Sequence, residues 1–230
     1  MTLYLKAGPD GTSVGDCPFA QYVRMVLHEK GLEYDVKPCT QETKPKWLID
    51  YYDGSMPALR HRKECYTESD VIAQYLDFFF QEPSLSSSSS DEIATASECL
   101  EGFFPNVAKY LKNTSDGDEQ DETLKSNLEQ ALGKIERHLQ QKSADDDAVT
   151  KGPFLVGSGE NISLMDCSLA PKLFHLKVGL AAFKNNAIDI PNKFPLLQNY
   201  MDTIFSRDSF QQSLYAEEIV VWGWSNARGD

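Results

Sequence analysis

The sequence has no hydrophobic run of the ~18 residues that a membrane-spanning helix needs. Its first residues, MTLYLKAGPDG, lack the basic segment and apolar core of a signal peptide. A membrane span is therefore not expected. We expect the protein in the cytoplasm, or in an organelle if a transit peptide has been removed from the chain.

Basic residues are in the minority, because 22 Lys and Arg stand against 35 Asp and Glu, which gives a formal net charge of −13. A chain of this charge has no long-range attraction for phosphate backbones or anionic membrane surfaces. Nucleic acid is therefore not expected as a partner. The 230 residues, 41% of them hydrophobic, suffice for one large or two small globular domains.

Closely spaced cysteines are also missing. The five cysteines, at 17, 39, 65, 99 and 167, form neither a CxxC motif nor a zinc-ribbon pattern. A chain of this length does not need disulfides for stability, so free thiols in a reducing compartment are expected. No metal site and no permanently bound cofactor is predicted.

Strand and helix signals alternate over residues 1–82, which predicts an α/β domain. Strands are expected at 3–5, 34–37, 58–60 and 64–66. Helices are expected after 17, over 46–52 and from 69, which gives the order βαβαββα. The serine-rich segment 83–92 is predicted to be a linker. Residues 93–230 carry only helical patterns and predict an all-α domain.

Other segments are interpreted as structural. The acidic stretches 116–122 and 145–147 are expected to be solvated loops. Residues 163–166 resemble a capping box, with Ile162 as its hydrophobic staple. Trp222 and Trp224 are either core anchors or a lid over a site, and the sequence leaves this open.

The segment GDCPFA (15–20) contains the candidate catalytic residue. Proline is favoured at the first position of a helix, so Pro18 makes Cys17 the N-cap. Helix N-termini lower a thiol pKa from ~8.5 to roughly 3.5–7.5, and the thiolate is the nucleophile. Lys6 would add positive charge. The Asp16 carboxylate opposes the thiolate and fits better as a substrate contact or proton carrier. A purely structural N-cap cysteine is the alternative.

The residue three positions after Cys17 is Ala20 instead of a second cysteine. Such a site cannot close an internal disulfide, so an outside thiol, most simply glutathione, must regenerate it. A cis Met56–Pro57 bond would expose the Met56 backbone to a peptide ligand, and the helix start at Ser69 would bind a carboxylate. An ordinary trans turn and a plain N-cap are the alternatives.

Several motifs together resemble one family. They are GDCPFAQYVRMVL (15–27), KPKW (44–47), MPAL (56–59), ESDVI (68–72), APKLFHLKVGL (170–180), FSRDSF (205–210) and GW (223–224). The sequence resembles dehydroascorbate reductases of the plant and algal type, which belong to the glutathione S-transferase superfamily.

This resemblance implies a thioredoxin-like N-terminal domain, an all-helical C-terminal domain and a monomer. It implies ping-pong reduction of dehydroascorbate to ascorbate by glutathione, with Cys17 as nucleophile and a mixed disulfide as intermediate. Lys6 and Asp16 would contact the substrate. The implied glutathione site comprises Phe19, Lys44, Met56, Pro57, Glu68 and Ser69. Glu68 replaces the expected Asp, and Ala20 replaces the more usual Ser.

Three other functions remain open at this point. A glutaredoxin-like or omega-type thiol transferase would use Cys17 without depending on Lys6 and Asp16. A redox-switched, membrane-inserting protein like the intracellular chloride channels carries a similar CPF motif. The third alternative is a binding module without enzymatic activity.

Overall fold

The computed structural model describes the chain except for residues 87–88, 116, 145–152, 158–160 and 230. Its contacts divide the chain into two compact units. Unit 1 comprises Met1–Ser84 and Asp208–Gly223, and unit 2 comprises Leu85–Arg207 and Trp224–Asp230. These units are sets of contacting residues, and the domain limits at 82 and 93 remain predictions.

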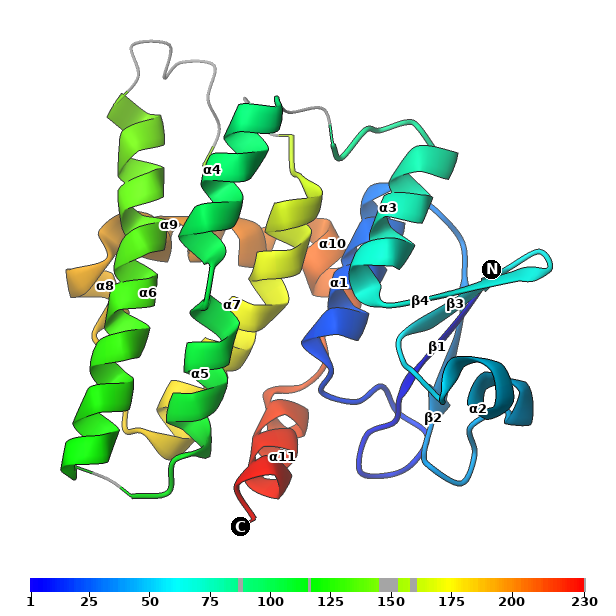
Figure 1. Ribbon diagram of the computed structural model, residues 1–230, viewed down its shortest axis with the longest axis horizontal. Coiled ribbons are helices and arrows are strands. Elements are labelled where there is room, and N and C mark those ends of the chain that lie inside the picture. The colour runs from blue at the N-terminus through cyan, green and yellow to red at the C-terminus, as the bar shows by residue number, and fades with distance from the viewer. Residues whose placement is uncertain (87–88, 116, 145–152, 158–160, 230) are drawn as a thin grey trace. The chain divides into compact units, whose positions relative to one another are not determined.

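Unit 1 is built on a four-stranded mixed sheet with the order β2-β1-β3-β4 (Figure 1). Strand β1 runs parallel to β2 and antiparallel to β3. The elements are β1 (Thr2–Lys6), α1 (Pro18–Glu29), β2 (Asp35–Cys39), α2 (Lys46–Tyr52), β3 (Ala58–His61), β4 (Glu64–Thr67) and α3 (Ser69–Phe79). The predicted order βαβαββα is confirmed.

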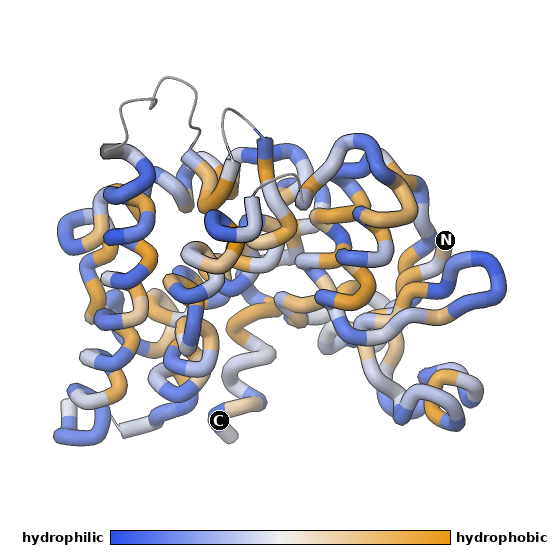
Figure 2. Tube along the Cα trace, turned by 45° about the horizontal axis from the view of Figure 1, so that its top comes forward, coloured by the Kyte–Doolittle hydropathy of each residue, from blue (hydrophilic) through white to orange (hydrophobic). Residues whose placement is uncertain are grey.

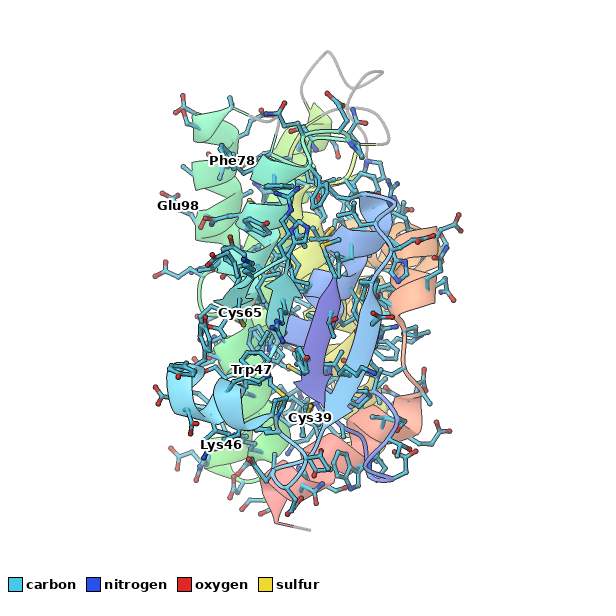
Figure 3. All side chains as sticks on the ribbon, turned by 90° about the vertical axis from the view of Figure 1, so that its right-hand side faces the viewer. Cys39, Lys46, Trp47, Cys65, Phe78 and Glu98 are labelled. Carbon is cyan, nitrogen blue, oxygen red and sulfur yellow. The ribbon has the colours of Figure 1, made fainter. Side chains whose placement is uncertain are left out.

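Alternation along β1 separates the two faces of this sheet. Leu3 and Leu5 point to one face and are fully buried. Tyr4 points to the other face and meets the Trp47 ring of α2 edge-on, with centroids 5.3 Å apart. Lys46, on the same short helix, is exposed (Figure 3).

The segment that closes unit 1 comes from far along the chain. Helix α10 (Asp208–Ser213) packs against α1, and α11 (Glu217–Arg228) begins in unit 1. The Arg24 guanidinium donates to the carbonyl oxygens of Ser213 at 2.6 Å and Gln212 at 3.1 Å. A cation at the end of a helix satisfies carbonyls that have no partner within that helix.

The described part of unit 2 is helical. Its main helices are α4 (Ser90–Leu100), α5 (Phe103–Lys112), α6 (Glu119–Ala144), α7 (Leu164–Phe183), α8 (Ile190–Lys193) and α9 (Pro195–Ser206). Hydrophobic and hydrophilic stretches alternate along these helices in Figure 2, as expected when each turn presents both core and surface positions. Four residues that recur at helical spacing along α6, Leu128, Leu132, Ile135 and Leu139, are buried. None of the described helices is long and apolar enough to cross a membrane.

Two interpretations of polar segments were wrong in part. The predicted linker contains the buried Leu85, and Ser89 forms a reciprocal capping box with Glu92 at the start of α4. In the acidic stretch 116–122, Asp121 is buried and accepts a 2.7 Å hydrogen bond from the Lys184 ammonium. The local polarity of 116–122 indicated solvent exposure, whereas Asp121 pairs with Lys184, which is 63 residues away in the chain. The stretch 145–147 lies outside the described residues.

The capping box at the start of α7 is confirmed. Asp166 accepts from the Ser163 backbone, and the amide of Asp166 donates to the Ser163 hydroxyl. Asp166 also accepts from the Leu155 amide and the Tyr200 hydroxyl, at 2.9 Å each. Burial raises the pKa of this carboxyl, although its hydrogen bonds act in the opposite direction. Asp166 is therefore a structural residue, and Ile162 beside it is buried.

Candidate active site

The strand register brings the candidate residues to one end of the sheet in unit 1. Lys6 ends β1 opposite Cys39, which ends β2. Because β3 is antiparallel to β1, its start at Ala58, preceded by Pro57, lies at this same end. Ala58 pairs with Thr67, the last residue of β4. Chain segments around Lys6, Pro57 and Glu68 therefore lie at the same end of the sheet.

Cys17 is the N-cap of α1, and Pro18 is the first helical residue, as predicted. Gly15 holds the preceding loop against β1, since its amide donates to the Lys6 carbonyl at 2.8 Å. The expected lowering of the Cys17 pKa was wrong. Burial raises the pKa of the thiol, and the amides of Ala20 and Phe19 lower it by less.

Lys6 and Asp16 form an ion pair beside this sulfur. The Lys6 ammonium lies 2.7 Å from Oδ1 of Asp16, and the side chains are 48% and 15% exposed. The two charges act on the Cys17 pKa in opposite directions, since Asp16 raises it and Lys6 lowers it. The pair therefore offers a donor and an acceptor at the surface next to the thiol.

The C-terminal segment of unit 1 also contacts the Lys6–Asp16 ion pair. Tyr215 is buried and donates its hydroxyl to the Asp16 carbonyl at 3.2 Å. Burial raises the pKa of Tyr215 well above its usual range, and Cys17 and Asp16 act in the same direction. The phenol therefore stays protonated. Trp222 places its ring 5.1 Å from the Lys6 ammonium.

These two aromatic residues were not assigned to the site from the sequence. The nearest signal was the question whether Trp222 and Trp224 are anchors or a lid. The structure separates them, because Trp222 contacts Lys6 in unit 1. Trp224 is buried in unit 2, with its ring centroid 6.0 Å from that of His175.

The residues expected to bind glutathione lie in unit 1. The Met56–Pro57 peptide bond is cis. Glu68 precedes α3 with a positive φ of 66° and is exposed, while Ser69 is buried at the first position of α3. The Lys44 side chain is half-buried beside Gly54.

Phe19, the sixth residue of the expected glutathione site, is 41% exposed directly after the first residue of α1. An exposed ring at this position is available to a ligand that approaches the helix N-terminus.

The remaining thiols do not join Cys17. None of the five cysteines forms a disulfide. Cys39 and Cys65 lie on β2 and β4, at opposite edges of the sheet (Figure 3). Cys99 and Cys167 are buried in unit 2. Within the described residues, no group of three or more His, Cys, Asp or Glu side chains is placed to hold a metal ion.

Comparisons with known proteins agree with this architecture. Residues 16–77 match the glutathione S-transferase N-terminal domain, and residues 118–203 match the glutathione S-transferase C-terminal domain. Glutathione S-transferase DHAR2 of Arabidopsis thaliana is 35% identical over 93% of this chain and 91% of its own length. The chain belongs to the glutathione S-transferase family.

Within the glutathione S-transferases, the resemblance to dehydroascorbate reductases is confirmed. The probable cytosolic glutathione S-transferase DHAR1 of rice is 33% identical over 93% of this chain and 91% of that protein. The crystal structure of Chlamydomonas reinhardtii dehydroascorbate reductase matches with a TM-score of 0.78 and 28% identity, over 98% of this chain and 97% of that chain. The predicted combination of an α/β domain and a helical domain is confirmed as this family's fold.

Proposed function

We propose that the protein reduces dehydroascorbate to ascorbate with two glutathiones, and that Cys17 is its nucleophile. The observation that supports this most is the Lys6–Asp16 ion pair beside a single N-cap thiol. A thiol alone would serve many redox reactions. The adjacent donor and acceptor suit a small substrate rich in carbonyl and hydroxyl groups. Relatives named as dehydroascorbate reductases support the same assignment.

In the first half-reaction, the Cys17 thiolate attacks a carbonyl carbon of dehydroascorbate, and the carbonyl oxygen takes up a proton. A glutathione thiolate then attacks the Cys17 sulfur, and the C–S electron pair leaves with ascorbate. A second glutathione attacks the mixed disulfide, which releases oxidised glutathione and restores the Cys17 thiolate. In an alternative first half-reaction, dehydroascorbate accepts two electrons from the Cys17 sulfur and leaves as ascorbate, while a water supplies the oxygen of a Cys17 sulfenic acid. The first glutathione then forms the mixed disulfide and releases that oxygen as water.

Because burial raises the pKa of Cys17, its thiol carries a proton that has to leave before the sulfur can attack. The Ala20 and Phe19 amides and the Lys6 ammonium stabilise the thiolate once it forms. Asp16 is adjacent in sequence to Cys17, and we assign it to the substrate hydroxyls or to carrying this proton. Lys6 is assigned to a substrate oxygen.

Glutathione is proposed to bind at the end of the sheet where β1 ends at Lys6 and β3 begins at Ala58. Its peptide backbone would pair with Met56 before β3, held by Pro57. A carboxylate would bind at the α3 N-terminus with Ser69, and Glu68 would contact the glutathione amine. Lys44 and Phe19 complete this proposed site, in which glutathione is a co-substrate and no other group stays bound.

The decisive assay follows glutathione-dependent ascorbate formation by ultraviolet absorbance for the wild type and Cys17→Ser. Turnover should be robust in the wild type and nearly abolished in the variant. Cys65→Ser, at the other half-exposed cysteine, is the matched control and should keep wild-type activity. Equal activity in the wild type and Cys17→Ser would refute the nucleophile assignment.

Wild-type activity on a glutathione mixed disulfide but none on dehydroascorbate would instead favour the thiol-transferase alternative.

A monomeric state is also proposed, and light scattering of the purified protein tests it. Relatives carry both cytosolic and chloroplastic names. We accordingly propose a cytosolic or an organellar location, which a fluorescent fusion would distinguish.

A further inference from the structure

The Asp16 side chain occupies the space that a side chain at Gly223 would fill. A Cβ atom built at Gly223 would lie 1.7 Å from Oδ2 and 2.3 Å from Cγ of Asp16. These separations are far below van der Waals contact, so any side chain at 223 would displace the carboxylate. A helical glycine elsewhere is different, because a Cβ at Gly133 of α6 meets its nearest atom at 3.4 Å.

The neighbour of Gly223 contacts the other member of the ion pair. The ring of Trp222 lies 5.1 Å from the Lys6 ammonium, which is itself 2.7 Å from Asp16 Oδ1. A cation near an aromatic face is attracted to its ring quadrupole. Upstream of α11, Tyr215 holds the Asp16 backbone carbonyl. The segment 215–223 therefore contacts both charges and the backbone that carries one of them.

We infer that Gly223 and Trp222 are positioning residues that orient Asp16 and Lys6 for dehydroascorbate. This inference rests on the proposed function, in which that ion pair contacts the substrate. Gly223 supplies the space in which the carboxylate faces the ammonium. Trp222 limits the positions that the flexible lysine adopts. Neither residue needs to touch a reacting atom.

A double-mutant cycle of Gly223→Ala and Asp16→Ala tests this inference. Gly223→Ala alone should lower kcat/KM for dehydroascorbate at least about tenfold, because hydrogen bonds to charged groups are worth that much. The loss should appear mainly in KM for dehydroascorbate, with KM for glutathione unchanged. In the Asp16→Ala background the same substitution should have much less effect, since the Oδ2 and Cγ atoms at 1.7 and 2.3 Å are removed and the Asp16 Cβ lies at 3.0 Å.

Trp222→Leu should raise KM for dehydroascorbate by roughly two- to fivefold, the range for a cation–aromatic contact at a partly exposed site. Gly133→Ala is the matched control for adding a methyl group to a helix and should leave both KM values unchanged. An equal effect of Gly223→Ala in both backgrounds, or none in either, would overturn the inference.

A second readout does not depend on dehydroascorbate. The pH profile of Cys17 alkylation, followed by mass spectrometry of its peptide, reports the charges beside the sulfur. Gly223→Ala should shift this profile in the wild type and leave it unchanged in Asp16→Ala. If the wild type makes no ascorbate, the proposed function fails, and this profile still decides whether Gly223 acts through Asp16. If Gly223→Ala alone does not fold, the double variant Gly223→Ala/Asp16→Ala should fold, because it lacks the carboxylate. Failure of both variants to fold would contradict the inference.

Discussion

Lys30 is a buried charged residue of unit 1 whose ammonium has three polar partners. Its ammonium lies 2.5 Å from Asp77 Oδ1 and donates to the carbonyl oxygens of Phe80 at 2.7 Å and Pro83 at 2.6 Å. The Lys30 side chain is 0% exposed and that of Asp77 is 9% exposed. Lys30→Met would leave a buried carboxylate and two carbonyls without this cation. Breaking a buried pair from one side costs about 3–5 kcal/mol.

At about 2–4 °C per kcal/mol for a chain of this length, the melting temperature should fall by roughly 6–20 °C. Urea unfolding and a thermal melt measure the two quantities. Lys193→Met is the matched control, because Lys193 pairs with Glu129 at the same kind of distance, 2.7 Å, but is 49% exposed. It should cost less than about 1 kcal/mol. Lys30→Met/Asp77→Leu should be more stable than Lys30→Met. Equal losses at positions 30 and 193 would refute the reasoning.

Three further predictions concern stability. Burial raises the pKa of Asp121, but hydrogen bonds led by Lys184 outweigh it and hold the pKa below its usual value. The stability that Asp121 adds should therefore be present above about pH 4 and be lost as pH falls further, so urea unfolding curves of wild type and Asp121→Asn should converge in acid. Gln21 is buried, and neither amide atom has a hydrogen-bond partner within the described residues; Gln21→Leu should be neutral or stabilising in a thermal melt, and a marked loss would contradict this. A Cβ at Gly15 would lie 2.7 Å from the carbonyl oxygens of Lys6 and Ala7, so Gly15→Ala should destabilise by about 1–3 kcal/mol in urea, and a neutral result would show that the loop yields.

Much of unit 1 could be predicted because its signals are local. Pro18 identified the helix start and therefore the N-cap position of Cys17. Alternating strands and short turns gave the order of the sheet elements. The capping box at 163–166 was likewise recognisable, since its two partners are three residues apart.

Contacts between distant residues could not be predicted in this way. Arg24 meets a carbonyl 189 residues away, and Asp121 meets an ammonium 63 residues away. The Cys17 pKa shows the same limit. The helix end is visible in the sequence, but the burial that outweighs it depends on packing around the thiol. Around Cys17, the sequence therefore pointed to Lys6 and Asp16 but gave Tyr215 and Gly223 no role, and it left Trp222 open as an anchor or a lid.

The contact of Arg24 with the end of α10 has a consequence for how the chain is made. Helix α1 leaves the ribosome early, but the carbonyls that its guanidinium binds belong to Gln212 and Ser213. Synthesis must pass residue 213 before this side of α1 is covered. The first segment of unit 1 thus emerges before residues 85–207 of unit 2, and its second segment, residues 208–223, emerges after them. During translation, the largely apolar helix α1 therefore has to stay soluble before the segment that binds Arg24 has been made.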